Sequence, residues 1–175
     1  MSIKKRISVA LLTVSAAGFV TWQASEGFTP TPVIPTKGDV PTIGNGSTRY
    51  EDGRRVKMTD PAISRERAAE LARNLMDQDA AQFAATMPGA KLNQAEFDVY
   101  MDFTGQYGLG NWRNSSMRRE VMAGNYAKAC GNLLKYRFAA GYDCSTLING
   151  KPNKRCYGVW TRQVARHKAC MEAQP

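Results

Sequence analysis

Hydrophobic and polar residues follow three successive patterns along this chain. Residues 7–25 form an uncharged and largely apolar run, whereas residues 26–57 show no helical period and carry four prolines and repeated glycines. From Pro61 onward apolar residues recur at intervals of three and four, which is the spacing of one face of an α-helix. The chain is therefore predicted to pass from an apolar segment, through loops and a small twisted hairpin around Val40 to Arg55, into a body of helices.

The helical body begins with an apolar stripe that follows helical spacing through residues 68–83. A second helix has a defined start at Asn93, where Glu96 stands three residues later and completes a capping box. This helix is predicted to run to the turn at 108–110. Shorter helices are predicted at 116–123, 126–140 and 158–173. The 175 residues leave no room for a second globular domain.

The first residues carry the signature of an export signal. The basic stretch Lys4-Lys5-Arg6 precedes the uncharged run Ile7–Ser25, a polarity that sets the N-terminus in the cytoplasm. Cleavage after Ala17 or Ala24 is one interpretation. However, Ala, Ser, Thr, Gly and Gln make up much of the run, and its nineteen residues would span about 28 Å as a helix. We therefore predict that residues 1–25 are an uncleaved, marginally hydrophobic membrane anchor.

Composition and charge narrow the class of protein. Hydrophobic residues make up 43% and charged residues 22%, as in globular rather than disordered proteins. The net charge of +9 implies an anionic partner. Nucleic acid is not favoured, because Lys and Arg are scattered and form no known nucleic-acid-binding motif. Bacterial cell wall and anionic lipid are equally good acceptors of a basic surface.

The cysteines indicate an oxidising compartment such as the periplasm. All four lie in the last third: Cys130, Cys144, Cys156 and Cys170. Without CxxC spacing, and with His167 as the only histidine, no metal site or cofactor is predicted. An even, clustered set behind an export signal predicts two disulfides, and four reduced core cysteines are the alternative. Of three possible pairings we favour Cys144–Cys156, around a turn at 149–152, and Cys130–Cys170 between helices.

A short motif carries the candidate chemistry. Glu26-Gly27-Phe28 is followed, sixteen residues after the Glu, by Thr42 at the start of Thr42-Ile43-Gly44-Asn45-Gly46. A carboxyl just ahead of a Gly-rich hairpin can form one wall of a cleft that cuts a glycosidic bond. The pattern resembles that of phage-type lysozymes, in which Glu, Asp and then Thr-Ile-Gly-x-Gly follow in order. Later segments also resemble that family's helices: 92–98, 103, 108–111, 115–116, 124–126 and 158–162.

The resemblance implies an α+β, lysozyme-like fold, with a small β-hairpin subdomain followed by a mainly helical body. It implies Glu26 as the general acid, which must stay protonated near neutral pH, and Thr42 as the residue that orients water or the sugar. Asp39 is the candidate second carboxylate, but it stands three residues before Thr42 rather than the family's six. A Gly-Asp turn is the alternative for Asp39, and Thr42 with a bound water would then serve in its place.

The resemblance further implies an endolysin that hydrolyses the β-1,4 bond between N-acetylmuramic acid and N-acetylglucosamine in peptidoglycan, and we expect a monomer. Residues 26–175 would form the catalytic domain. The N-terminal segment resembles the signal-arrest-release segment of some phage endolysins, which implies tethering to the host inner membrane and later release into the periplasm. The alternatives are a non-catalytic cell-wall binding protein of the same fold and a cationic membrane-disrupting protein.

Overall fold

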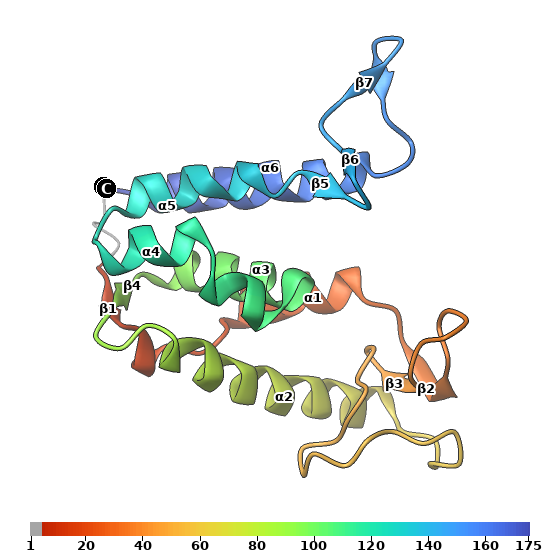
Figure 1. Cartoon of the computed structure of the whole chain (residues 1–175). Helices are drawn as coiled ribbons and strands as arrows, with labels where there is room; N and C mark the ends of the chain where they lie inside the picture. Colours follow the sequence, from red (N-terminus) through yellow and green to blue (C-terminus); the bar gives the residue numbers. More distant parts are fainter. Residues whose placement is uncertain (1–4) are drawn as a thin grey trace. The chain divides into compact units, whose positions relative to one another are not determined.

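The chain forms two compact units. A computed structural model describes residues 5–175, apart from the side chains of Thr21 and Ser25, so Lys4 of the basic head lies outside the described residues. The helical unit comprises residues 5–12 and 84–175, and the hairpin unit comprises residues 13–83. The long helix α2 (Arg65–Ala85) carries the chain from the hairpin unit into the helical unit (Figure 1).

The apolar run near the N-terminus is not a single helix in this structure. It is divided into β1 (Ile7–Ser8), the 3-10 helix η1 (Val9–Leu11) and α1 (Ala16–Ser25). β1 pairs antiparallel with β4 (Lys91–Leu92), and Val9 and Leu12 are buried. The ten residues of α1 span only about 15 Å. Among the helices of residues 5–175, none combines the length and the apolar character that crossing a bilayer requires.

The hairpin unit contains a two-stranded antiparallel sheet that begins earlier than predicted. β2 (Thr29–Val33) pairs with β3 (Thr42–Gly44), and isolated bridges at Ile43–Ser47 and Arg49–Arg55 continue the turn region. The assignment of residues 29–33 to a loop was wrong. Prolines lack the N–H group of a sheet ladder, but both strands of a two-stranded sheet are edges, where proline is tolerated.

A small core and an ion pair hold the hairpin unit together. Ile43, Val56 and Leu71 form its buried cluster, so the predicted apolar stripe of α2 is confirmed. The Arg67 guanidinium donates to both oxygens of Glu51, each at 2.7 Å. These hydrogen bonds lower the pKa of the Glu51 carboxyl to about 2. The loop that carries Glu51 is thereby tied to α2.

The helical unit follows the predicted order of helices. Its helices are α3 (Gln94–Arg113), α4 (Ser116–Met122), α5 (Tyr126–Asn132), the 3-10 helix η2 (Leu133–Lys135) and α6 (Tyr157–Glu172). The capping box is confirmed: Asn93 Oδ1 accepts from the Glu96 N–H at 3.0 Å, and Glu96 Oε2 accepts from the Asn93 N–H at 2.9 Å. Gly108 interrupts α3 with φ 82°, at the predicted turn. Trp112 is fully buried in the core of this unit.

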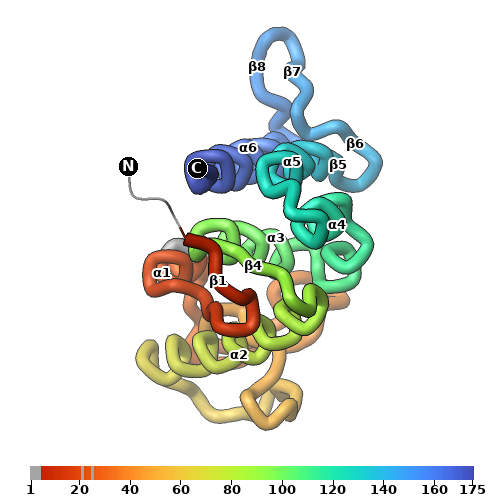
Figure 2. The backbone as a smooth tube through the Cα atoms, turned by 90° about the vertical axis from the view of Figure 1, so that its left-hand side faces the viewer, coloured from red at the N-terminus to blue at the C-terminus, as the bar shows by residue number. Residues whose placement is uncertain are grey.

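The predicted helix at 126–140 is shorter than expected. After η2 the chain forms two short hairpins, β5 (Phe138–Ala139) with β6 (Tyr142–Asp143) and β7 (Leu147–Ile148) with β8 (Lys151–Pro152) (Figure 2). Their connections, 140–141 and 149–150, have positive φ at both residues, as tight two-residue hairpins require. The two predicted disulfides are confirmed, with S–S bonds joining Cys130 to Cys170 and Cys144 to Cys156.

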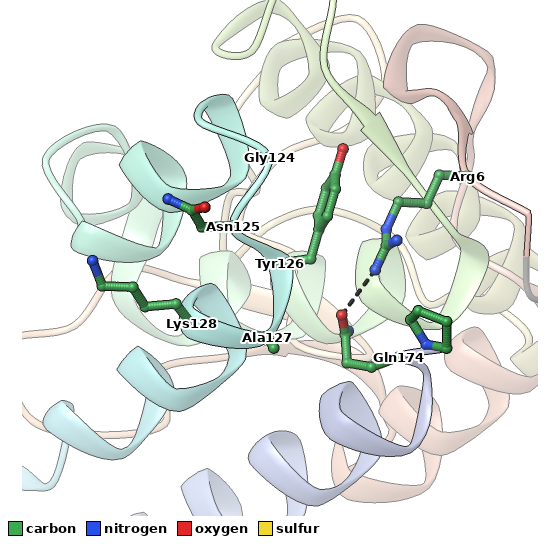
Figure 3. Close-up of a pocket in the computed structure, with 8 residues that line it drawn as sticks. Arg6, Gly124, Asn125, Tyr126, Ala127, Lys128 and Gln174 are labelled. Atoms are coloured by element: carbon green, nitrogen blue, oxygen red, sulfur yellow. Dashed lines mark hydrogen bonds between the residues drawn. The ribbon is translucent and has the colours of Figure 1, made fainter.

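A buried charged cluster joins the two ends of the chain within the helical unit. The Glu96 side chain is 1% exposed, and its Oε1 accepts from Arg6 Nη2 at 2.6 Å and from Gln174 Nε2 at 2.9 Å. Arg6 Nη2 also donates to Gln174 Oε1 at 2.8 Å, and the guanidinium lies 3.7 Å from the centre of the Tyr126 ring (Figure 3). Arg6, predicted as part of an export signal, is therefore an internal component of the fold.

Candidate active site

Glu26 lies at the junction between α1 and the β2–β3 hairpin. It caps the C-terminal end of α1, and it is exposed to solvent. Its carboxylate faces the turn that follows β3, because Oε2 is 3.7 Å from the position that a Cβ on Gly46 would occupy. Gly46 has φ 81°, which favours glycine. The turn thus leaves room beside the carboxylate of Glu26.

Asn45 connects this turn to the residue that follows Glu26. Its Nδ2 donates to the Gly27 carbonyl at 3.1 Å, and the side chain is buried. Its Oδ1 atom is also buried, and it has no hydrogen-bond partner among the described residues. A buried carbonyl oxygen without a partner is costly and can accept a hydrogen bond from a bound ligand. Sequence reasoning missed Asn45, because it occupies the variable position of the Ile-Gly-x-Gly pattern.

Gly44 sets the position of the turn against α2. Its φ is 65°, and a Cβ at this residue would lie 2.9 Å from the Cβ of Ala68 and 3.3 Å from Cδ1 of Ile63. Any larger residue would therefore displace the end of β3 from α2. The first glycine of the motif is explained by packing and backbone conformation rather than by contact with a polysaccharide.

Thr42 and Asp39 lie on the same hairpin but in different environments. Thr42 is half-buried in β3, and its hydroxyl donates to the Val33 carbonyl at 3.4 Å, a long contact that leaves the hydroxyl available to water or a sugar. Asp39 is exposed in the β2–β3 loop, where its N–H donates to the Thr36 carbonyl at 2.9 Å. Within residues 5–175, no hydrogen bond or ion pair joins Asp39 to Glu26. Their catalytic roles stay predictions.

The described residues contain no group of three or more His, Cys, Asp and Glu side chains that could hold a metal ion. His167, the only histidine, lies half-buried on α6 in the helical unit. The groups that the hairpin unit brings to the site are a carboxylate, a hydroxyl and an amide oxygen. Such groups can donate or accept protons and position a polar substrate.

The arrangement of elements is that of lysozymes. An endolysin from Escherichia coli O157:H7 phage FAHEc1 is 20% identical, with a TM-score of 0.70 over 94% of this chain and 98% of that one. A mutant of P22 lysozyme is 20% identical, with a TM-score of 0.69 over 92% and 99%. The muramidase domain of SpmX from Asticaccaulis excentricus is 18% identical, with a TM-score of 0.66 over 91% and 97%.

Sequence comparison gives the family as well as the fold. The Phage lysozyme family profile matches residues 23–169, a range that includes Glu26, Asp39 and Thr42. The chain therefore belongs to the phage lysozyme family, and it is a hydrolase of the lysozyme class. No curated protein matches this chain.

Proposed function

We propose that this protein hydrolyses the β-1,4 bond between N-acetylmuramic acid and N-acetylglucosamine in peptidoglycan and thereby lyses a bacterial host. The observation that carries the proposal is the Glu26 carboxylate, which faces the Gly46 turn of the family's hairpin motif. The positive net charge of +9 suits the anionic bacterial envelope. The structural relatives that bear the names endolysin and muramidase support the same role.

In this mechanism Glu26 acts as the general acid that protonates the oxygen of the scissile glycosidic bond. Because Glu26 is exposed, the bound glycan strand has to exclude water from the carboxyl. The second group acts on the attacking water, either through the Asp39 carboxylate or through a water held by the Thr42 hydroxyl. Asn45 fixes the backbone beside Glu26 through its hydrogen bond to the Gly27 carbonyl.

The products of digestion test the proposed bond. Purified peptidoglycan sacculi treated with the enzyme and then reduced with borohydride should yield fragments that end in reduced N-acetylmuramic acid, as mass spectrometry would show. Fragments that end in reduced N-acetylglucosamine would assign the other glycosidic bond. Sacculi that bind the protein but release no reducing ends would establish the non-catalytic cell-wall binding protein instead.

The N-terminal segment supports a second part of the proposal, which is release from the inner membrane without cleavage. Cleavage after Ala17 or Ala24 would remove Arg6 from Glu96 and β1 from β4. Residues 7–25 cannot span the bilayer and form β1, η1 and α1 of the fold at the same time. We therefore propose that the enzyme is inactive while tethered through residues 7–25. It becomes active in the periplasm when this segment leaves the membrane and folds.

Raising the hydrophobicity of the segment should hold the enzyme in the membrane. The test replaces Ser15, Ala16, Ala17 and Gly18 with Leu. Each Leu favours membrane insertion by about 0.3–0.6 kcal/mol. We expect the variant to stay in the membrane fraction after depolarisation and to delay lysis. Because Ser15 Oγ also accepts from the Gly18 N–H at 3.0 Å and caps α1, Ser15→Ala is the matched control for lost capping. A soluble wild-type protein that begins near residue 18 or 25 would show an ordinary cleaved signal.

A further inference from the structure

Residues 137–156 form a feature that the hydrolase chemistry does not use, and we name it the hairpin arm. It consists of the β5–β6 and β7–β8 hairpins in series, between η2 and α6. The Cys144–Cys156 disulfide closes the base of the second hairpin, with a Cα–Cα distance of 5.0 Å. Figures 1 and 2 both show this second hairpin projecting away from α6.

The tip of the hairpin arm exposes aliphatic side chains. Leu147 is 56% exposed and its neighbour Ile148 is 60% exposed. Adjacent residues of a strand point to opposite faces, so neither face of this ribbon is covered. A lone two-stranded hairpin is only marginally stable, and here a disulfide rather than a core holds it. The arm therefore presents an apolar tip that has no partner among the described residues.

The hairpin arm is also cationic, with Lys151 at the tip opposite Ile148 and Lys154 and Arg155 nearer the disulfide. The arm carries four basic residues and one acidic residue, a net charge of +3. Its one carboxylate, Asp143, is already paired with Arg137 at 3.0 Å. No salt bridge to a described carboxylate involves the other three basic side chains, which are Lys151, Lys154 and Arg155. The Arg155 guanidinium stacks 3.9 Å from the centre of the half-exposed Tyr142 ring.

Exposed aliphatic side chains next to cations and an aromatic ring suit an anionic bilayer, and Lys151, opposite Ile148, is long enough for its ammonium to reach the headgroups. Aliphatic side chains favour the acyl boundary, Tyr favours the headgroup level, and Lys and Arg bind anionic headgroups. A glycan strand offers no apolar interior for Leu147 and Ile148. We propose that the hairpin arm docks this enzyme on anionic phospholipid membranes, with its tip inserted and its basic residues at the headgroups. The docking requires neither hydrolysis nor the N-terminal segment.

Vesicle binding by the purified full-length protein tests the proposal. Vesicles of phosphatidylethanolamine with phosphatidylglycerol should bind the wild type, and neutral phosphatidylcholine vesicles should bind it much more weakly. The double change Leu147→Thr and Ile148→Thr keeps residues suited to a strand and should weaken binding by at least about tenfold. The double change Lys151→Ser and Lys154→Ser should weaken binding to the anionic vesicles by about 25-fold, from about fivefold for each charge.

A matched pair of exposed aliphatic residues separates the hairpin arm from the N-terminal segment. Leu11 and Val20 are 75% and 61% exposed, so Leu11→Thr with Val20→Thr removes a similar apolar surface. This control should bind anionic vesicles like the wild type. All variants should digest lipid-free sacculi at the wild-type rate, which keeps the docking test independent of the proposed hydrolysis. Titration of free thiols would confirm that the disulfides are intact in each variant.

Three results would overturn the docking proposal. The first is a Leu147 and Ile148 variant that binds anionic vesicles as tightly as the wild type. The second is loss of vesicle binding in the Leu11 and Val20 control alone, which would assign the membrane contact to the N-terminal segment. The third is that the hairpin-arm variants no longer bind lipid-free sacculi. The arm would then bind the cell wall and not the membrane.

Discussion

Replacing Glu26 with Gln is expected to lower the rate of peptidoglycan hydrolysis by at least about a hundredfold, because a positioned general acid contributes roughly 10²–10⁴. Gln keeps the shape of the side chain but cannot donate the proton. Since Glu26 is exposed, the variant should fold normally. Turbidity loss of chloroform-treated cells and reducing ends released from sacculi would measure the rate. Glu70→Gln, an exposed carboxyl on α2, is the matched control and should keep full activity.

The second catalytic group can be identified in the same assay. If the Asp39 carboxylate acts on the attacking water, Asp39→Ala should be nearly as damaging as Glu26→Gln. Asp52→Ala, another exposed turn aspartate of the hairpin unit, should have no effect. A loss below about threefold in Asp39→Ala, together with a large loss in Thr42→Ala, would assign the role to the hydroxyl and its water. A folded Glu26→Gln enzyme of near wild-type rate would contradict the whole mechanism.

Replacing Arg6 with Ala is expected to lower the free energy of unfolding of the purified protein by about 3 kcal/mol or more. The change leaves the Glu96 carboxylate buried without its charged partner, and breaking a buried ion pair typically costs about 3–5 kcal/mol. The urea midpoint of the purified protein, followed by circular dichroism, would measure the loss. Arg6→Lys should lose less, because the charge is kept while the forked contact with both carboxylate oxygens is lost.

Lys5→Ala is the matched control for Arg6, because it removes one charge from the same basic head. Lys5 is exposed, so its replacement should shift the urea midpoint little. Equal, small shifts in Lys5→Ala and Arg6→Ala would contradict the structural role of Arg6. Arg6 would then be only a targeting residue.

The parts of the fold that local chemistry determines could be predicted from the sequence. The apolar stripe of α2 and the capping box at Asn93 are properties of one helix, so spacing alone was enough to find them. The disulfide pairing followed from four clustered cysteines, because one pair spans a short turn and the other joins two helices. The family could also be recognised, from the resemblance of the Glu26 and Thr42 segment to its signature.

The parts that depend on distant contacts could not be predicted. The strand at 29–33 contains two prolines, and only its pairing with β3 shows it to be a strand. Arg6 had the surroundings of an export signal, and its ion pair with Glu96 crosses ninety residues of sequence. The role of Asn45 is visible only where its amide meets the Gly27 carbonyl. The Ile-Gly-x-Gly pattern accepts any residue at the position of Asn45, so the pattern does not indicate a role for Asn45.

The hydrogen bond between Arg6 and Gln174 has a consequence for the time course of synthesis. The two residues are 168 positions apart, so the site that receives Arg6 is complete only after Gln174 has left the ribosome. At about 5–20 residues per second, this takes roughly ten to thirty seconds. Throughout that interval the nascent N-terminal segment has no finished partner within its own chain. That interval is the time in which the proposed insertion of the segment into the membrane can precede its folding.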